Sequence, residues 1–236
     1  MAVYGCRHMS ARHELIEAAS GEGTFLGRLP DSLRERLLAD ASVIETRRGQ
    51  TVFSAEEAAD RVGIVAGGLV RTFLTADDGR RLTVRYARVG AMVGSITEGR
   101  AALSVQAISD SALLELRVST LQECLVNDGR VGMVLLAEVA QRLRDTYATL
   151  ASNTFGSMRE RVARHILDLS FEEPGGLGPS ATVTQQGLAD GVGTVREVVA
   201  RILRDFRAEG LVSTSPGRIR ILDADGLAAL IGHELA

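Results

Sequence analysis

Residues Val183–Asp205 read VTQQGLADGVGTVREVVARILRD, and this stretch predicts two short helices joined by a tight turn. Thr184 suits the N-cap of the first helix, because its hydroxyl can accept a hydrogen bond from a backbone N–H of the first turn. Gly191-Val192-Gly193 is expected to break that helix, since glycine tolerates the backbone angles of a tight turn. Two helices in this arrangement form a helix-turn-helix, whose second helix would enter the major groove of DNA.

The second helix is expected to open at Thr194, because Thr194-Val195-Arg196-Glu197 has the spacing of a capping box. Apolar residues recur along it at helical spacing and predict a buried face: Val198, Val199, Ile202, Leu203 and Phe206. Arg196, Glu197 and Arg201 fall outside this face. Arginine can donate two hydrogen bonds to guanine and glutamate can accept one from cytosine, so these three are the candidate base-reading residues. The alternative is that they are solvated helix charges.

A small basic hairpin follows the two helices. Residues Ser215–Ile221, SPGRIRI, contain a Pro-Gly turn and place Arg218 and Arg220 alternately on the return strand. A helix-turn-helix followed by such a hairpin predicts a winged helix, and the combination is more specific than either part. Although the whole chain has a net charge of −3, six arginines stand against three acidic residues between Thr194 and Arg220. The charge is therefore unevenly distributed, with a local positive excess in this region.

The stretch VGTVREVVARILRDFRAEGLV resembles the DNA-binding helix of the Crp–Fnr (catabolite activator) family, with its VG-x-x-RE-x-V-x-R-x-L-x-x-L pattern. The resemblance implies that Arg196, Glu197 and Arg201 stand where the base-reading residues of the family stand. Val195 and Val198 occupy places where the family often has small hydroxyl residues that bind phosphate. Contacts with the DNA backbone are therefore expected from other residues nearby: Gln185, Thr194, Arg204, Arg218 and Arg220.

The 236 residues suffice for one large or two modest domains, and an apolar content of 45% supports a real core. No apolar run approaches a membrane span, and the N-terminus lacks an apolar signal core. Cys6 and Cys124 are isolated and have no metal-binding or redox spacing. No catalytic motif is present, and His165 is expected on a helix surface rather than as a haem ligand. We therefore expect a cytoplasmic protein that is not an enzyme, with no cofactor, no metal and no membrane partner.

Between Val43 and Arg117 the periodicity changes to short apolar runs separated by glycine or charge. Eight runs are expected to be strands: Val43–Thr46, Thr51–Phe53, Arg61–Ala66, Leu69–Leu74, Leu82–Tyr86, Ala91–Val93, Leu103–Ile108 and Ala112–Leu116. Asp78-Gly79 is a hairpin signal between two of them. Short strands at this spacing predict a β-sandwich or jelly-roll barrel. The run ADRVGIVAGGLVRTFLTADDGRRLTVRYARVGAMVG is also similar to the effector domain of the Crp–Fnr family.

The resemblance implies that the glycine-rich stretch Val89–Gly94 opens an effector pocket, which in the family binds a cyclic nucleotide. The chain has Gly94-Ser95-Ile96 where the family has Gly-Glu for the ribose, and Ala101-Ala102-Leu103 where it has Arg-Ser-Ala for the phosphate. Arg100 is either a phosphate ligand displaced by one residue or a solvated loop arginine. A cyclic phosphate buried without its cation would cost several kcal/mol. We therefore expect that the protein is not an ordinary cyclic-AMP sensor, and that the pocket accepts a different, less anionic ligand or none.

Leu121 to about Ser152 is predicted to form one long helix, with glycine weakening its start. A 3-4 alternation indicates a coiled-coil seam between two copies of the chain, made by Leu136, Val139, Leu143 and Leu150 with Thr146 in the same row. The alternative for part of this stripe is burial against the β-domain of the same chain. The family resemblance implies that Thr146 and Tyr147 face the effector pocket, Thr146 matching a threonine that contacts adenine.

Asn153-Thr154 is predicted to be a hinge, followed by a helix over Phe155–Phe171 with an inward face formed by Val162, Ile166 and Leu169. Residues 173–179 are predicted to be a loop. Near the N-terminus we expect a short helix over 10–19, with Met9 as an alternative translation start, and a helix from Pro30 to about Asp40.

The predicted fold is α+β, with a cyclic-nucleotide-binding-like β jelly roll, a long dimerisation helix and a C-terminal winged helix-turn-helix. Its domains are residues 1–120, 121–153 and 154–236. The predicted function is that of a homodimeric transcription regulator that reads a two-fold symmetric site in double-stranded DNA. RNA polymerase and an unidentified small effector are further candidate partners. The alternatives are a regulator that responds to cyclic nucleotides through Arg100, and a ligand-binding module without a role on DNA.

Overall fold

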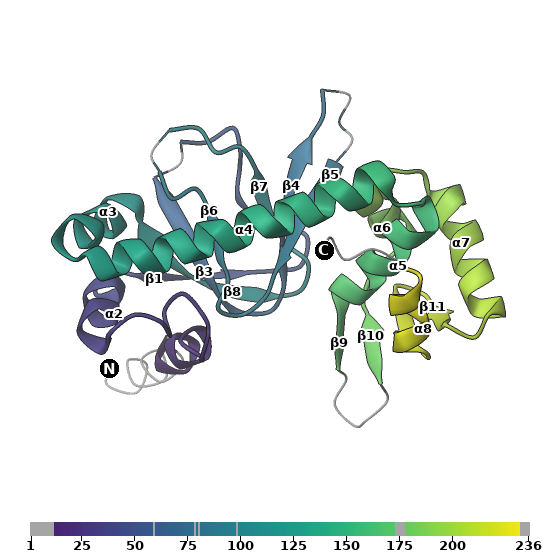
Figure 1. The fold of residues 1–236 in the computed structure, drawn as a ribbon, viewed down its shortest axis with the longest axis horizontal. Coiled ribbons are helices and arrows are strands. Elements are labelled where there is room, and N and C mark those ends of the chain that lie inside the picture. The colour runs from purple at the N-terminus through teal and green to yellow at the C-terminus, as the bar shows by residue number, and fades with distance from the viewer. Residues whose placement is uncertain are drawn as a thin grey trace, which may run out of the picture. The chain divides into compact units, whose positions relative to one another are not determined.

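The computed structural model describes residues 12–58, 60–77, 79, 81–97, 99–172 and 178–231. It divides into two compact units (Figure 1), Met1–Leu74 with Arg85–Arg144, and Thr75–Val84 with Asp145–Ala236. The predicted start of the first helix at Ser10, the alternative start at Met9 and most of the predicted loop over 173–179 lie outside the described residues. The division into three domains stays a prediction.

The first unit begins with two helical stretches. Residues 12–19 are helical, and helix α2 spans Asp31–Leu38 with Pro30 at its N-cap. Proline suits this position because it has no N–H to leave unsatisfied and its φ is already close to the helical value. Three leucines of α2 are buried: Leu33, Leu37 and Leu38.

Two four-stranded sheets form the body of the first unit, in the orders β1-β8-β3-β6 and β2-β7-β4-β5. The eight predicted strands are confirmed, with small shifts at their ends. Their bounds are β1 Ser42–Thr46, β2 Thr51–Phe53, β3 Arg61–Gly67, β4 Val70–Thr75, β5 Arg81–Ala87, β6 Met92–Gly94, β7 Ser104–Ala107 and β8 Ser111–Arg117.

Alternation along β3 and β8 explains how the two sheets enclose a core. Val62 and Ile64 of β3 pack with Leu114 and Leu116 of β8 in the cluster that also holds the helices of this unit. Val65 of β3 and Leu113 of β8 belong to a second cluster, together with Val93 of β6 and Val105 of β7. Because successive side chains of a strand point to opposite faces, one sheet faces two apolar layers. The predicted jelly-roll fold is thereby confirmed.

The predicted single long helix is two helices. Helix α3 spans Val118–Asn127 and α4 spans Gly129–Phe155. Asp128 between them is extended, and its carboxylate accepts a hydrogen bond from the Arg130 backbone N–H at 2.9 Å. The same carboxylate pairs with the Arg130 guanidinium at 2.6 Å. Asp128 caps α4, so the new helix starts only two residues after α3 ends. The helical periodicity of the sequence therefore does not reveal the break.

The predicted hinge at Asn153-Thr154 is also wrong, since α4 continues to Phe155. The break falls at Gly156-Ser157, where Ser157 and Glu160 form a capping box for helix α5, Met158–Leu169. This helix therefore begins later and ends earlier than the prediction of Phe155–Phe171. Its inward residues Val162, Ile166 and Leu169 are buried, as predicted.

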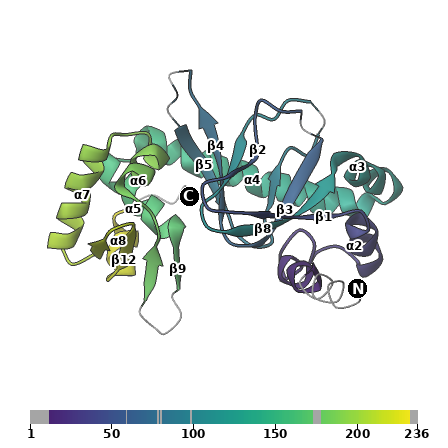
Figure 2. The same ribbon diagram turned by 180° about the vertical axis from the view of Figure 1, so that it is seen from behind.

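The second unit contains three further helices and a four-stranded sheet of order β11-β12-β10-β9. Its elements are β9 Ser170–Glu172, β10 Pro179–Ala181, α6 Gln185–Val192, α7 Arg196–Ala208, β11 Val212–Ser215, β12 Arg218–Ile221 and α8 Ala224–Ala229. Within this unit α7 lies on one side, with α6 and α5 beside it, in both views (Figure 1, Figure 2). The sequence does not indicate strands β9 and β10, because three residues are too few to show a period. Pro179 belongs to β10 rather than to the predicted loop.

Candidate nucleic-acid interface

Helix α6 begins as predicted and ends later than predicted. The Thr184 hydroxyl accepts a hydrogen bond from the Gly187 N–H at 3.0 Å, which confirms Thr184 as the N-cap. Gly191 and Val192 are helical, and only Gly193 ends the helix, with φ at 70° in the left-handed region. Glycine at this C-terminal position is favoured because it adopts that conformation without steric cost.

Gly191 has a different role from the one predicted. A Cβ at this position would lie 1.9 Å from Nε2 of His165 on α5. His165 is buried, so the expectation that it lies on a helix surface is wrong. The missing side chain of Gly191 lets α5 and α6 approach each other, and this contact supports the helix-turn-helix from behind.

Helix α7 begins at Arg196, and its N-cap is Val195, which makes no side-chain capping bond. The predicted capping box at Thr194 is therefore wrong. The Thr194 N–H donates to the Ala189 carbonyl at 2.9 Å, which keeps Thr194 in the turn after α6. Glu197 lies in the first turn of α7, where a negative charge is favoured by the helix dipole.

The two faces of α7 divide as predicted, with one difference. Val199, Ile202, Leu203 and Phe206 are buried, whereas Val198 is half-buried. The polar residues lie on the opposite, exposed face: Arg196, Glu197, Arg201 and Arg204. The structure thus brings the three predicted base-reading residues together on one accessible surface.

The hairpin predicted as the wing is β11 and β12, joined by Pro216-Gly217, in which Gly217 has φ at 73°. Ile219 and Ile221 are buried, while Arg218 is exposed and Arg220 is half-buried. The alternation predicted for the return strand is present. A contact that the sequence does not reveal ties the wing to α7, because Arg207 Nη1 donates to Thr214 Oγ1 at 2.9 Å.

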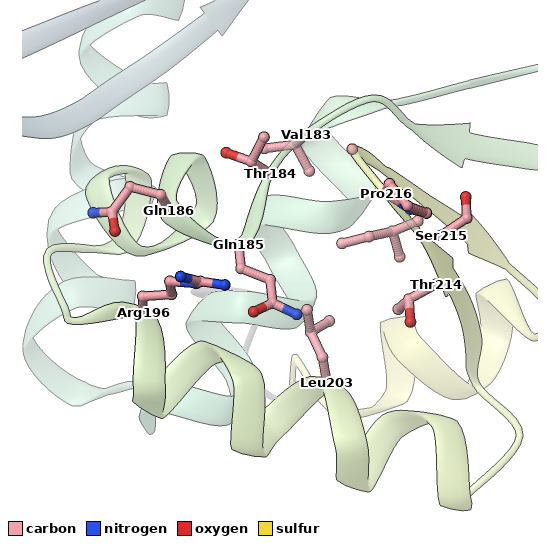
Figure 3. Close-up of a pocket in the computed structure, with 11 residues that line it drawn as sticks. Val183, Thr184, Gln185, Gln186, Arg196, Leu203, Thr214, Ser215 and Pro216 are labelled. Carbon is pink, nitrogen blue, oxygen red and sulfur yellow. The ribbon is translucent and has the colours of Figure 1, made fainter.

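A groove of about 700 Å³ lies between α6, α7 and the wing (Figure 3). Its walls come from the start of α6, from α7 and from the hairpin: Val183, Thr184, Gln185, Gln186, Arg196, Leu203, Thr214, Ser215, Pro216, Gly217 and Ile219. The Gln185 side chain points from α6 towards α7 and ends near Leu203, and Arg196 stands farther along α7 (Figure 3). The predicted DNA-backbone residue Gln185 and the predicted base reader Arg196 therefore share one groove.

Two arginines on α5 support this surface, and no motif in the sequence indicates them. The Arg161 guanidinium donates to the Val192 carbonyl at the end of α6, and burial lowers the pKa of Arg161. Arg159 pairs with Glu209 just after α7, and its guanidinium lies 4.7 Å from the centroid of the Phe206 ring. The Arg161 side chain thus joins α5 to the end of α6, and the Arg159 side chain joins α5 to the end of α7.

Two of the predicted effector residues in the first unit, Gly94 and Ser95, already make hydrogen bonds within the protein. Gly94 ends β6 with φ at 84°, and its carbonyl accepts a hydrogen bond from Arg142 Nη1 at 3.3 Å. The Ser95 hydroxyl donates to the Thr97 carbonyl at 2.7 Å, within its own loop. Arg100 is exposed and Ala101 is half-buried. Thr146 and Tyr147 are exposed on α4 in the other unit, so a pocket that they share with Gly94 stays a prediction.

The predicted seam on α4 is an exposed apolar stripe. Exposed fractions are 61% for Leu136, 36% for Val139, 49% for Leu143 and 59% for Leu150. Leu136, Val139 and Leu143 lie in the same unit as most of the β-domain, and for these three residues the alternative of burial against that domain is therefore wrong. Met133 at 68% and Tyr147 at 54% continue the stripe at helical spacing.

None of the helices that the structure describes is long and apolar enough to cross a membrane. Within the same described part of the chain, no three His, Cys, Asp or Glu side chains gather in a way that could hold a metal ion.

Comparison with known proteins gives two matches along the chain. The Cyclic nucleotide-binding domain profile matches residues 43–128, and the Crp-like helix-turn-helix domain profile matches residues 160–230. The "Cyclic AMP receptor protein" of Thermus thermophilus is 31% identical over 180 residues, which are 75% of this chain and 82% of the relative. The chain belongs to the Crp–Fnr family of transcription regulators, and its second unit carries the DNA-binding helix-turn-helix of that family.

Two further similarities extend over most of the chain. The "CRP-like cAMP-activated global transcriptional regulator" of Mycobacterium tuberculosis is 28% identical over 219 residues, covering 90% of this chain and 97% of the relative. The structure of the c-di-GMP responsive global regulator CLP of Xanthomonas campestris superposes with a TM-score of 0.70 at 25% identity, covering 82% of this chain and 100% of that one. The fold and the general function of the chain, transcription regulation through DNA binding, follow from this membership.

Proposed function

We propose that the protein binds a two-fold symmetric DNA site as a homodimer, with α7 of each copy reading bases in the major groove. The observation that carries this proposal is the division of α7 into a buried apolar face and an exposed face with Arg196, Glu197 and Arg201. Arginine and glutamate are suited to the edges of a G·C pair, which offer two acceptors on guanine and one donor on cytosine. The helix is held from behind by α5 and α6, so its exposed face can meet DNA as a rigid unit.

Contacts with the phosphate backbone are proposed for a ring of residues around that face: Gln185, Thr194, Arg204, Arg218 and Arg220. Arg218 lies at the tip of the wing, and Gln185 lies in the groove between α6 and α7 (Figure 3). Such contacts set the position of the protein on the duplex and make its affinity depend on salt, but they carry no base specificity.

Dimerisation through α4 is supported by its exposed stripe. Leu136, Leu143 and Leu150 recur every seven residues and are 49–61% exposed in the single chain. A helix that repeats apolar residues at this spacing is stabilised by a second helix that covers them. Two copies related by a two-fold axis would present two α7 helices to successive major grooves of a palindromic site.

We further propose that cyclic AMP is not the ordinary effector, even though two relatives are named for it. Ser95 replaces the ribose carboxylate of the family motif, and its hydroxyl is engaged with Thr97. Ala101 replaces the phosphate arginine. The second candidate function is a cyclic-nucleotide-responsive regulator in which Arg100 holds the phosphate. Arg100 is exposed, so a ligand could reach it, and this is the one observation that favours the alternative. RNA polymerase and an unidentified effector are candidate partners, and we infer no enzymatic activity.

Selection of binding sites from random DNA, followed by fluorescence anisotropy with the selected duplex, tests the proposal. We expect a palindromic site, bound by a dimer without added ligand. A monomer in sedimentation, or no sequence preference after selection, would contradict it. Calorimetry with cyclic AMP tests the effector statement separately, and micromolar binding together with a gain in DNA affinity would favour the second candidate.

A further inference from the structure

One apolar side chain is exposed at the start of α7, the end of the helix that is proposed to enter DNA. Val195 is 58% exposed, whereas Val199, one turn further along, is fully buried. Val195 is the N-cap of α7 and has an extended backbone, with φ at −105° and ψ at 153°. The next two residues, Arg196 and Glu197, are exposed as well. An exposed valine therefore stands directly beside two of the candidate base-reading residues.

Helix capping does not account for valine at this position. Serine, threonine, aspartate and asparagine are preferred at an N-cap, because their side-chain oxygens accept hydrogen bonds from N–H groups of the first turn, and valine is among the least favoured residues there. Val195 accordingly makes no side-chain capping bond. Its side chain also cannot donate a hydrogen bond to a phosphate. Two methyl groups can make only apolar contacts with whatever the helix end meets.

The major groove offers such a side chain one apolar partner. The base edges in that groove present hydrogen-bond donors and acceptors, and the C5-methyl group of thymine is the exception. In a helix-turn-helix, the N-terminal residues of the second helix are the ones that contact base edges. A contact between Val195 and a thymine methyl group would remove both apolar groups from water, which is favourable. An exposed valine, ordinary elsewhere on a protein surface, is therefore matched to a base at this place.

We propose that Val195 is a specificity-determining residue that recognises a methyl group at C5 of a pyrimidine, which in ordinary DNA is thymine. The inference rests on the proposed function, since it requires α7 to lie in the major groove. Val195 and Arg201 are six residues apart, which is about 9 Å along a helix. Base pairs follow one another about every 3.4 Å along the duplex. The thymine is therefore expected within about three base pairs of the G·C pair that Arg201 reads.

Replacement of thymine by uracil tests this contact, because uracil keeps every hydrogen bond of the A·T pair and lacks only the methyl group. Fluorescence anisotropy with the full chain measures the dissociation constant of the selected duplex, with each thymine of one half-site replaced in turn. We expect one position at which uracil raises the dissociation constant about fourfold, the effect of one buried methyl-sized group. That position should lie within about three base pairs of the pair at which Arg201→Ala relaxes the base preference.

Val195→Ser assigns the effect to this side chain. It removes both methyl groups and supplies a preferred N-cap, so the variant is expected to fold at least as stably as the natural chain. Thymine and uracil should then bind with affinities less than twofold apart. Arg201→Ala should weaken binding to both duplexes and keep their fourfold ratio. Leu222→Ser is the matched control, since Leu222 is 57% exposed outside α7, and it should change neither the affinity nor the ratio.

Cytosine and 5-methylcytosine at the same position separate the two sources of the methyl group. Tighter binding of 5-methylcytosine would show that the methyl group is read on either pyrimidine, and equal binding of the two would confine the recognition to thymine. Equal affinity for thymine and uracil at every position, or a difference that Val195→Ser retains, would overturn the role of Val195 and leave the proposed function standing. Absence of any sequence preference would instead contradict the proposed function, and this inference with it.

Discussion

Helices α4 and α7 are both amphipathic, and each leaves one face uncovered in the single chain. The uncovered face of α7 is charged, with Arg196, Glu197 and Arg201, whereas that of α4 is apolar, with Leu136, Leu143 and Leu150. A charged face is well solvated, so it is stable in water without a partner. Exposure of an apolar stripe on a long helix costs free energy, and burial of the stripe under another surface is favourable.

The difference indicates what each face binds. The face of α7 presents hydrogen-bonding groups that match base edges, so its partner is selected by chemistry. The face of α4 presents leucines at a seven-residue spacing, so its partner is a second helix with the same spacing. Substitutions that place a charge on the apolar face of α4, or remove a charge from the face of α7, test what each face binds.

Leu143→Glu is expected to have the largest effect, because it would bury two charges in the seam of a dimer. We expect the dimer dissociation constant to rise more than about 100-fold, roughly 3 kcal/mol. Sedimentation should show monomers, and the selected DNA duplex should no longer be bound at nanomolar protein. Ala148→Glu is the matched control, since Ala148 is exposed on the same helix outside the seam. Equal dissociation in both variants would show that charge on α4, not the seam, is what matters.

Gly191→Ala should disturb α7 from behind without touching its charged face. The added methyl group would lie 1.9 Å from His165 Nε2, so the second unit should lose up to about 3 kcal/mol of unfolding free energy. Chemical denaturation measures this change. His165→Ala in the same chain removes the obstructing ring and should restore part of the loss, whereas His165→Ala that leaves the Gly191→Ala effect unchanged would contradict the contact.

Arg196→Ala and Arg201→Ala are each expected to cost about 1–3 kcal/mol on the selected duplex and to relax preference at one G·C pair, as should Glu197→Ala at its cytosine. Anisotropy titrations with single base-pair variants measure both effects. Arg204→Ala, the proposed phosphate contact, should instead weaken selected and random DNA alike and reduce the salt dependence. If the base-reading variants behaved like Arg204→Ala, they would be phosphate contacts.

Asp128→Asn is expected to have the smallest effect, and one that depends on pH. Hydrogen bonding to Arg130 lowers the pKa of Asp128 from 3.8 to about 2 in the folded protein. A lowered folded pKa means that the stabilisation is present above pH 3.8 and is lost as the pH falls towards 2. The difference in Tm between the natural chain and the variant should therefore shrink over this interval. A difference that stays constant from pH 6 to pH 2 would show that the ion pair contributes nothing.

Local sequence patterns predicted most of the candidate DNA-binding surface formed by α6, α7 and the wing. The cap at Thr184, the turn at Pro216-Gly217 and the buried face of α7 each depend on a few neighbouring residues, so a sequence of one chain is enough to find them. The predicted capping box at Thr194 failed because the same spacing also fits a turn, and a backbone bond to Ala189 decided between the two. The exposed charges of α7 then followed from its buried face.

The sequence by itself determined the order of the elements, the winged helix-turn-helix and the periodicities of α4 and α7, because these are short-range properties of the chain. Tertiary structure alone decided which distant groups meet. The contact of Gly191 with His165 and the approach of Arg85 and Arg142 to β6 join residues from separate elements. No spacing in the chain encodes such approaches, since they depend on how strands and helices pack, and packing is settled by the burial of the whole core.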